Sequence, residues 1–332
     1  MFRDYVIRLP EIGREIYFVD REVELAQLEQ MALHGYVFPV AIYGPEGCGK
    51  TTLLRCFFDA IRRRNGNTVA IYIDALEEND IRRALHSSIE ELWNVVEVSL
   101  QFLPVGTQLA RSIVAMLRKL HEKVPLRGKN VVVIVDDVYR AIGLENVDRY
   151  TKSLYESIDY LHRYMDVGKV LILLTTSEGV SKRELHRHTY VHVYMLWNLP
   201  REGFEELVQQ LEPPRNIDTD TLWRLTGGNP RALIELARLG WSIGLWRARI
   251  FEDRIRRVLN LVDRDRLKSL AEDPDSDWRT AELLEEMGLM IELKRVLVLG
   301  RAPDPDPELG IGRDWAWQLP VYRDLLLEAL RR

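Results

Sequence analysis

The chain has 332 residues, two cysteines and a formal net charge of −5 at pH 7. This length indicates two or three domains and ample apolar material for a core. The mildly acidic balance excludes a global basic field for nucleic acid, and two cysteines exclude a disulfide framework. Since no signal peptide leads the chain and no apolar stretch is long enough to cross a bilayer, we expect a soluble cytoplasmic protein without membrane contact.

Residues 1–36 form a lead-in, in which apolar residues at Leu25, Leu28, Met31 and Leu33 predict a helix that opens near Arg21. The charge of Arg21 has two interpretations that the pattern alone leaves open. It is either a solvated helix-end charge or a contact to a bound nucleotide.

A phosphate-binding loop follows the first apolar run. That run ends at Gly44, and after Lys50 apolar residues recur at helical spacing as far as Ile61. The residues between this strand and the helix match the phosphate-loop motif G-x-x-x-x-G-K-[ST]. Glycines let backbone N–H groups surround phosphate oxygens, Lys50 supplies charge to the β- and γ-phosphates, and the Thr51 hydroxyl is a Mg²⁺ ligand. The predicted binding residues are Gly44, Pro45, Glu46, Gly47, Cys48, Gly49, Lys50, Thr51 and Thr52. The motif predicts a bound nucleoside triphosphate.

Two acidic residues follow the third predicted strand. Residues 68–75 are the second strand, and residues 77–127 have a helical pattern punctuated at Leu103–Gly106. Residues 131–135 are wholly apolar and lead into Asp136 and Asp137. A buried strand that delivers a carboxylate to its carboxyl end is how P-loop enzymes hold Mg²⁺, and Asp136 is the better metal candidate.

Hydroxyl residues follow the fourth predicted strand. After a helix over 151–165, the strand over 169–176 runs into Thr175-Thr176-Ser177. The Thr176 hydroxyl either contacts the γ-phosphate or belongs to an ordinary hydroxyl-rich turn. With a fifth strand over 190–196, the alternation of strands and helices predicts an α/β fold with a doubly wound parallel sheet. Its ligand is expected at the carboxyl ends of the strands.

After the fifth predicted strand, the sequence predicts mainly short helices. Short helices are expected over 200–211, 219–225 and 230–239, with Asn229 as N-cap and Pro230 at the first helical position of the third. Further helices, including 280–287, and a β-hairpin of 289–293 with 296–299 indicate a winged helix. We therefore predict three domains: a P-loop ATPase core over 1–198, a helical lid over 199–259 and a winged-helix-like domain over 260–332.

These motifs, in this order, resemble the archaeal ATPase family of the STAND class, relatives of the AAA+ ATPases. The resemblance rests on Phe18–Leu25, the phosphate loop, Asp136-Asp137, Thr175-Thr176-Ser177 and Leu225–Pro230, and it spans about residues 17–330. It implies that ATP is the nucleotide, that Arg21 lies by the adenine and that Pro230 approaches the nucleotide from the lid. It also implies that Asp137 is the catalytic carboxylate, and that nucleotide state sets the orientation of lid and winged helix.

Two departures from the family pattern favour slow hydrolysis. Many relatives carry Glu where this chain has Asp137, and a shorter side chain holds its carboxylate farther from the water. Plant and animal members often carry Arg where Ser177 stands. We therefore expect a slow Mg-ATP switch that binds ATP and ADP and acts on a protein partner or by self-association.

The alternative is a DNA-binding ATPase resembling archaeal replication initiators, which join a similar core to a winged helix. It is less favoured, because residues 261–332 hold 16 acidic against 11 basic side chains and residues 280–287 carry three glutamates and no base. A third alternative is an adaptor that binds ATP only for stability.

Overall fold

The computed structural model describes residues 4–64, 66–76, 84–88, 109–143, 146–176 and 190–331. The chain divides into two compact units. We call Glu22–Tyr43 together with Lys50–Tyr194 the sheet unit. Met1–Arg21, Gly44–Gly49 and Met195–Arg332 together form the loop-and-lid unit. Each unit is described by itself.

The sheet unit is built on strands in the order β3-β7-β6-β4-β5. Their bounds are Val40–Tyr43 for β3, Thr68–Asp74 for β4, Leu85–Ser87 for β5, Asn130–Asp136 for β6 and Val170–Thr175 for β7. The pairs β3–β7, β7–β6 and β6–β4 are parallel. The apolar runs of β3 and β7 are buried along their whole length, as is usual for parallel strands covered on both faces.

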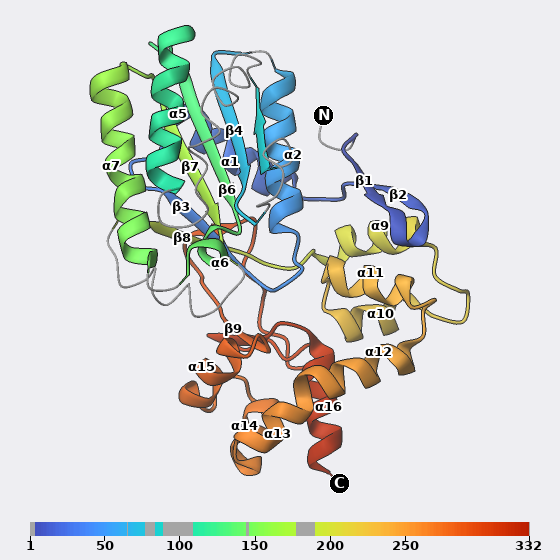
Figure 1. The fold of residues 1–332 in the computed structure, drawn as a ribbon. Coiled ribbons are helices and arrows are strands. Elements are labelled where there is room, and N and C mark those ends of the chain that lie inside the picture. Colours follow the sequence, from blue (N-terminus) through green and yellow to red (C-terminus); the bar gives the residue numbers. More distant parts are fainter. Residues whose placement is uncertain are drawn as a thin grey trace. The chain divides into compact units, whose positions relative to one another are not determined.

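Helices cover both faces of these strands (Figure 1). They are α1 (Glu22–His34), α2 (Lys50–Arg63), α5 (Leu109–Lys123), the short α6 (Val138–Ile142) and α7 (Val147–Met165). Helix α5 packs on α7, and α1 packs on α2. The predicted α/β fold with a doubly wound parallel sheet is confirmed.

The helical prediction for residues 77–127 was wrong at Leu85–Ser87. These residues form β5, which pairs antiparallel with β4. The Ala70 N–H beyond the pairing donates to the Ser88 side chain at 2.8 Å. Local periodicity missed the strand because the backbone groups along the outer side of β4 need partners, and that requirement comes from the sheet. Helix α5 agrees with the prediction, whereas the Leu103–Gly106 punctuation lies outside the described residues.

The loop-and-lid unit begins with a hairpin that the sequence did not reveal. Strands β1 (Val6–Leu9) and β2 (Arg14–Tyr17) pair antiparallel around the 3₁₀ turn Pro10–Ile12. The lid helices are α9 (Arg201–Leu211), α10 (Thr219–Thr226), α11 (Pro230–Arg238) and α12 (Ile243–Ile250). Leu9 and Ile16 of the hairpin are buried in one apolar cluster with Phe204 of α9. The β1–β2 hairpin is therefore part of the lid core.

After α12 come a π-helical turn at Phe251–Ile255 and then α13 (Arg256–Leu261), α14 (Arg264–Glu272) and α15 (Trp278–Glu286). Strands β9 (Met290–Glu292), β10 (Val298–Leu299) and β11 (Trp315–Trp317) precede the last helix, α16 (Pro320–Leu330). These elements agree with the expected helices followed by small strands. The division into 1–198, 199–259 and 260–332 stays a prediction.

The predicted hairpin of 289–293 with 296–299 was wrong. Strand β9 pairs antiparallel with β11, and β10 pairs parallel with the end of β8 (His192–Leu196), at Met195 and Leu196. Two large side chains explain the choice, since Trp315 and Trp317 are each only 1% exposed and their burial outweighs that of a Val-Leu pair.

No helix in the described part of the chain is both long and apolar enough to span a bilayer.

We predict that Ile16→Ala lowers the free energy of unfolding of the loop-and-lid unit by about 2–5 kcal/mol, because it leaves a cavity in the lid core. Ile16 is 2% exposed, whereas Val6 on the same hairpin is 41% exposed. Val6→Ala is therefore the control, with an expected change below about 0.5 kcal/mol. Urea unfolding followed by tryptophan fluorescence measures both. Equal effects of the two substitutions would contradict the place of the hairpin in this core.

Candidate nucleotide-binding site

Two hydroxyl groups of the sheet unit hold the carboxylate of Asp136, which ends β6. The Tyr72 hydroxyl donates to Asp136 Oδ2 at 2.6 Å, and the Thr175 hydroxyl donates to Asp136 Oδ1 at 2.6 Å. Asp136 is 2% exposed, and Tyr72 and Thr175 are 1% exposed. Because both bonds reach a charged acceptor, they are stronger than neutral hydrogen bonds and fix the orientation of the carboxylate.

Asp137 lies in the left-handed backbone region, with φ 52° and ψ 30°. Its N–H donates to the Thr175 hydroxyl oxygen at 2.7 Å. One hydroxyl thus accepts from the Asp137 backbone and donates to the Asp136 side chain. Asp tolerates this backbone region better than most residues. The turn directly after β6 is therefore held by the end of β7.

Tyr72 is also contacted from its other side. Arg55 Nε donates to the Tyr72 hydroxyl oxygen at 3.3 Å, and the same guanidinium forms an ion pair with Asp74 at 3.1 Å. Burial first, and then the negative charge of Asp136, raise the pKa of Tyr72 well above its ordinary value. The phenol therefore remains a hydrogen-bond donor at neutral pH.

Lys50 and Thr51 open α2, and Lys50 is 8% exposed. The donor set of the sheet unit fits Mg²⁺, since Thr51 and Asp136 provide one hydroxyl and one carboxylate. Mg²⁺ prefers oxygen ligands and commonly takes one or two carboxylates together with phosphates and waters. Thr176 directly follows β7, is 2% exposed, and its N–H donates to the Ile42 carbonyl at 3.0 Å.

The phosphate loop, Gly44–Gly49, belongs to the loop-and-lid unit. A Cβ atom at Gly44 would lie 1.9 Å from the Leu196 carbonyl oxygen. At Gly47, where φ is +84°, a Cβ would lie 2.5 Å from the Arg231 Cβ. Both positions therefore require glycine, because a side chain would collide with Leu196 or Arg231.

Arg21 is 4% exposed and supports the loop through its backbone. Its Nη2 donates to the Cys48 carbonyl at 3.1 Å and to the Trp197 carbonyl at 2.7 Å. A planar guanidinium is well suited to joining two carbonyl groups in this way. This contact makes Arg21 a positioning residue for the loop. Its expected place beside the adenine stays a prediction.

The turn that opens α11 also holds the loop. Asn229 caps α11, since its Oδ1 accepts from the Ala232 N–H at 3.1 Å. Its Nδ2 donates to the Glu46 carbonyl at 2.9 Å and to the Asn198 side chain at 2.9 Å. The Arg231 N–H donates to the Gly47 carbonyl at 3.3 Å. Pro230, which is half-buried, stands at the first position of this helix.

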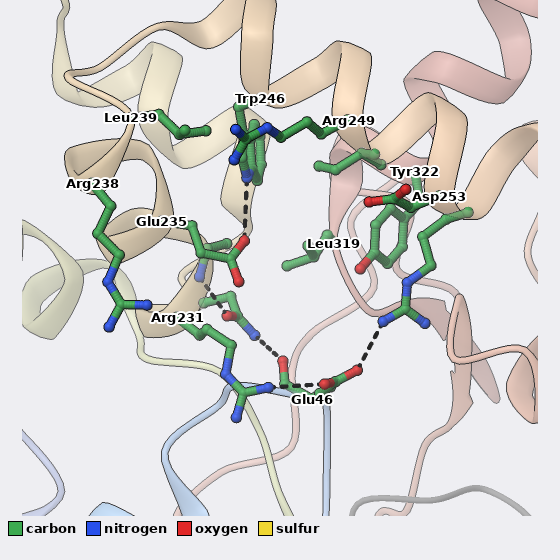
Figure 2. Close-up of a pocket in the computed structure, with 14 residues that line it drawn as sticks. Glu46, Arg231, Glu235, Arg238, Leu239, Trp246, Arg249, Asp253, Leu319 and Tyr322 are labelled. Atoms are coloured by element: carbon green, nitrogen blue, oxygen red, sulfur yellow. Dashed lines mark hydrogen bonds and ion pairs between the residues drawn. The ribbon is translucent and has the colours of Figure 1, made fainter. Parts of the chain in front are cut away.

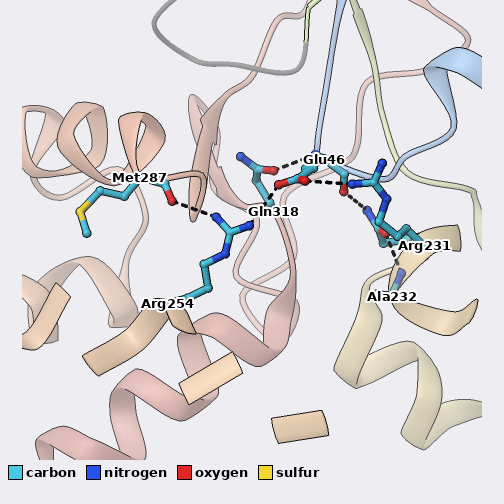
Figure 3. Close-up of polar contacts among 7 residues, drawn as sticks. Glu46, Arg231, Ala232, Arg254, Met287 and Gln318 are labelled. Carbon is cyan, nitrogen blue, oxygen red and sulfur yellow. Dashed lines mark hydrogen bonds and ion pairs between the residues drawn. The ribbon is translucent and has the colours of Figure 1, made fainter. Parts of the chain in front are cut away.

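Glu46 contacts residues of the lid and residues of the C-terminal region. Its Oε1 pairs with Arg231 Nη1 at 2.9 Å and its Oε2 with Arg254 Nη2 at 3.2 Å (Figure 2). Its N–H donates to the Gln318 side chain at 2.8 Å (Figure 3). Together with the Asn229 bond to the Glu46 carbonyl, these contacts form what we call the Glu46 clamp.

Gln318 and Arg254 extend the clamp toward the C-terminal strands. Gln318 Nε2 donates to the Met290 carbonyl at 3.1 Å, and its carbonyl accepts from Asn198 Nδ2 at 3.3 Å. Arg254 Nη1 donates to the Met287 carbonyl at 3.4 Å (Figure 3). A single loop residue is therefore linked to α11, to the π-helical turn and to the segment between β11 and α16.

The structure brings the predicted residues together in two sets. The sheet unit gathers Asp136, Asp137 and the end of β7, and the loop-and-lid unit gathers Arg21, Gly44–Gly49 and the start of α11. Ser177 lies outside the described residues. Sequence reasoning missed Tyr72, Arg254 and Gln318. Tyr72, a tyrosine in an apolar strand two residues before an aspartate, was the one signal available.

Residues 18–236 match the family described as an ATPase domain predominantly from Archaea. This match covers more than half of the chain, so the chain belongs to this family of P-loop ATPases. No curated protein matches the chain.

Two solved structures resemble the chain at low identity. The Aeropyrum pernix ORC2 protein, in ADPNP-ADP complexes, is 13% identical with a TM-score of 0.45, and the alignment covers 99% of this chain and 100% of that chain. The FIGL-1 AAA domain is 18% identical with a TM-score of 0.36, with 74% and 72% covered. Because both TM-scores lie below 0.5, the family assignment rests on the sequence match.

We predict that Tyr72→Phe lowers the free energy of unfolding at pH 9 by about 1–3 kcal/mol, because Asp136 loses a buried donor. The loss should shrink at higher pH. Above the ordinary tyrosine pKa of 10.0 the unfolded chain releases the phenol proton while folded Tyr72, with its raised pKa, retains it. The stability that the proton provides is complete below pH 10 and declines above it, by about 1.4 kcal/mol per pH unit.

Denaturant unfolding of wild type and Tyr72→Phe at pH 9, 10 and 11 measures this effect. Tyr164, which is 72% exposed, provides the control substitution Tyr164→Phe. A difference between wild type and Tyr72→Phe that stays constant from pH 9 to pH 11 would show that Tyr72 is not the proton-retaining group.

Proposed function

We propose that this ATPase is a Mg-ATP-dependent molecular switch of the STAND type that hydrolyses ATP slowly. Nucleotide state would set the orientation of the lid and of the winged-helix-like region. The observation that carries the proposal is the Glu46 clamp. Through it, a residue in the middle of the phosphate loop contacts both regions whose orientation a switch must control.

The proposed chemistry assigns one role to each group. Lys50 and the backbone N–H groups of the loop bind the triphosphate, and Asp137 polarises the attacking water. Magnesium, when bound through Thr51 and Asp136, would neutralise charge on the β- and γ-phosphates. The hydroxyls of Tyr72 and Thr175 orient Asp136 for that task. Thr176 is proposed to face the γ-phosphate.

Nucleotide specificity and exchange are proposed to depend on the loop-and-lid unit. Arg21 would lie beside the adenine of ATP or ADP, and Pro230 would approach the nucleotide from the lid. Asn229 and Arg231 next to that proline bond directly to loop carbonyls. Movement of the loop on nucleotide exchange would therefore be transmitted to α11.

The geometry at Asp137 supports the proposal of slow turnover. A side chain one methylene shorter than Glu reaches less far toward a water. The left-handed backbone at this position, φ 52°, also restricts where the carboxylate is directed. We therefore expect a rate of ATP hydrolysis that suits a molecular switch rather than a motor protein.

We propose a protein partner or self-association in the cytoplasm, rather than DNA. Helix α15 exposes Trp278 and Leu283, which are 50% and 39% exposed. Outside the buried Glu285 it carries two glutamates, Glu282 and Glu286, against one base, Arg279. Such a surface repels phosphates and offers apolar area to a protein. Salt-sensitive binding of duplex DNA by the full-length chain, measured by fluorescence anisotropy, would contradict this assignment.

We predict that Lys50→Ala abolishes ATP binding, whereas Asp137→Asn retains binding and lowers kcat about 100-fold or more. Fluorescent nucleotide titration and phosphate release measure the two properties. Lys268→Ala, at an exposed position on α14, is the matched control and should behave as wild type. Full hydrolysis by the Asp137→Asn variant would remove the proposed role of this residue.

We predict that Glu46→Gln speeds ADP release about two- to fivefold, because it removes both ion pairs of the clamp while retaining its backbone bonds. The effect is modest since the Glu46 side chain is 45% exposed and solvent screens such pairs. Stopped-flow release of a fluorescent ADP gives the rate. Arg256→Gln, which breaks an exposed i,i+4 pair with Glu252 outside the clamp, should leave it unchanged. Identical rates of ADP release for Glu46→Gln and wild type would contradict a role of the clamp ion pairs in nucleotide exchange.

A further inference from the structure

A cavity of about 420 Å³ lies within the loop-and-lid unit (Figure 2). Helices α11 and α12, the π-helical turn and the segment Leu319–Tyr322 surround it. Of the loop residues Gly44–Gly49, all of which the structure describes, Glu46 alone lines the cavity. The cavity is therefore distinct from the phosphate cradle, and its volume is within the usual range for small-molecule sites.

Four arginines line this cavity: Arg231, Arg238, Arg249 and Arg254. Three acidic side chains accompany them: Glu46, Glu235 and Asp253. The formal charge of the lining is therefore positive, which is unusual for a cavity in an acidic chain. A positive cavity attracts anions and concentrates them near its walls.

The four arginines differ in whether they already form ion pairs with acidic side chains. Arg231 and Arg254 share Glu46, and Arg238 pairs with Glu11 at 2.9 Å. Arg249 forms no ion pair with any residue that the structure describes. Glu235 accepts from the Trp246 indole N–H at 3.3 Å. At least one guanidinium is thus available to a ligand without breaking an ion pair.

The rest of the lining is apolar and aromatic. Trp246, Leu319 and Tyr322 are 2%, 7% and 9% exposed and line the wall between the arginines. Aromatic side chains favour a planar ring in stacked or edge contact. Guanidinium groups favour a phosphate, which presents several oxygens and up to two negative charges to more than one arginine.

We propose that this cavity binds a small phosphate monoester with a planar apolar body, about the size of a mononucleotide. The phosphate contacts Arg249 and shares Arg231 and Arg254 with Glu46, and the ring packs against Trp246 and Tyr322. Binding of this kind competes with the Glu46 carboxylate for its two arginines and so loosens the Glu46 clamp. The inference does not depend on ATP hydrolysis.

Titration calorimetry of the full-length chain with 1-naphthyl phosphate tests the site, with 1-naphthol as the neutral counterpart. We expect the phosphate to bind and 1-naphthol to bind at least tenfold more weakly. Arg249→Gln should weaken binding of the phosphate about tenfold, since it removes a charged hydrogen bond. Arg257→Gln, at an exposed position outside the cavity, should bind like wild type.

Two further variants separate this site from the nucleotide site. Glu46→Gln should bind 1-naphthyl phosphate several-fold more tightly, because its arginines are released, and Lys50→Ala should bind it as wild type does. Absence of binding, equal affinity of Arg249→Gln and wild type, or equal affinity for 1-naphthol would overturn the proposal. Loss of binding in Lys50→Ala would place the probe in the phosphate loop and also overturn it. None of these results depends on whether the chain turns over ATP.

Discussion

The phosphate loop is fixed by contacts from residues distant in the sequence, and the site geometry within the loop-and-lid unit depends on this constraint. Leu196 allows no side chain at Gly44, Arg21 joins the Cys48 carbonyl to Trp197, and Asn229 bonds to the Glu46 carbonyl. Most of these contacts are to backbone atoms, so they specify the shape of the loop rather than its side chains. A loop of this kind cannot relax independently of the lid, and this is the physical basis for the switching role that we propose.

Apart from β5, the fold of the sheet unit was predictable because its parallel strands are mainly apolar and its helices have clear periodicity. Segments of β6 and β7 are buried along their length, and each ends at the polar residues that the motifs identified. Candidate site residues within a motif could be proposed from the sequence for the same reason. Each motif requires a particular residue type at a particular position, such as a glycine beside a carbonyl or a carboxylate at the end of a strand.

What the sequence did not reveal depends on pairing between distant segments. The choice of β11 over β10 as partner of β9 is decided by two tryptophans some 25 residues away along the chain. The β1–β2 hairpin is short, and its burial comes from α9 and its neighbours rather than from its own pattern. Tyr72, Gln318 and Arg254 act through long-range bonds that have no periodic signature. In each case contacts between distant segments, rather than local sequence preferences, determine which residues pair.

The hairpin at residues 6–17 has a consequence for how the chain can be divided. The family match begins at residue 18, directly after β2. A fragment cut at that boundary would keep every recognised motif yet remove Leu9 and Ile16 from the lid core, leaving their apolar partners facing solvent. Expression of a fragment that begins at residue 18 would then favour aggregation, although every predicted site residue is present. The boundary of the conserved domain and the boundary of the folding unit are different in this protein.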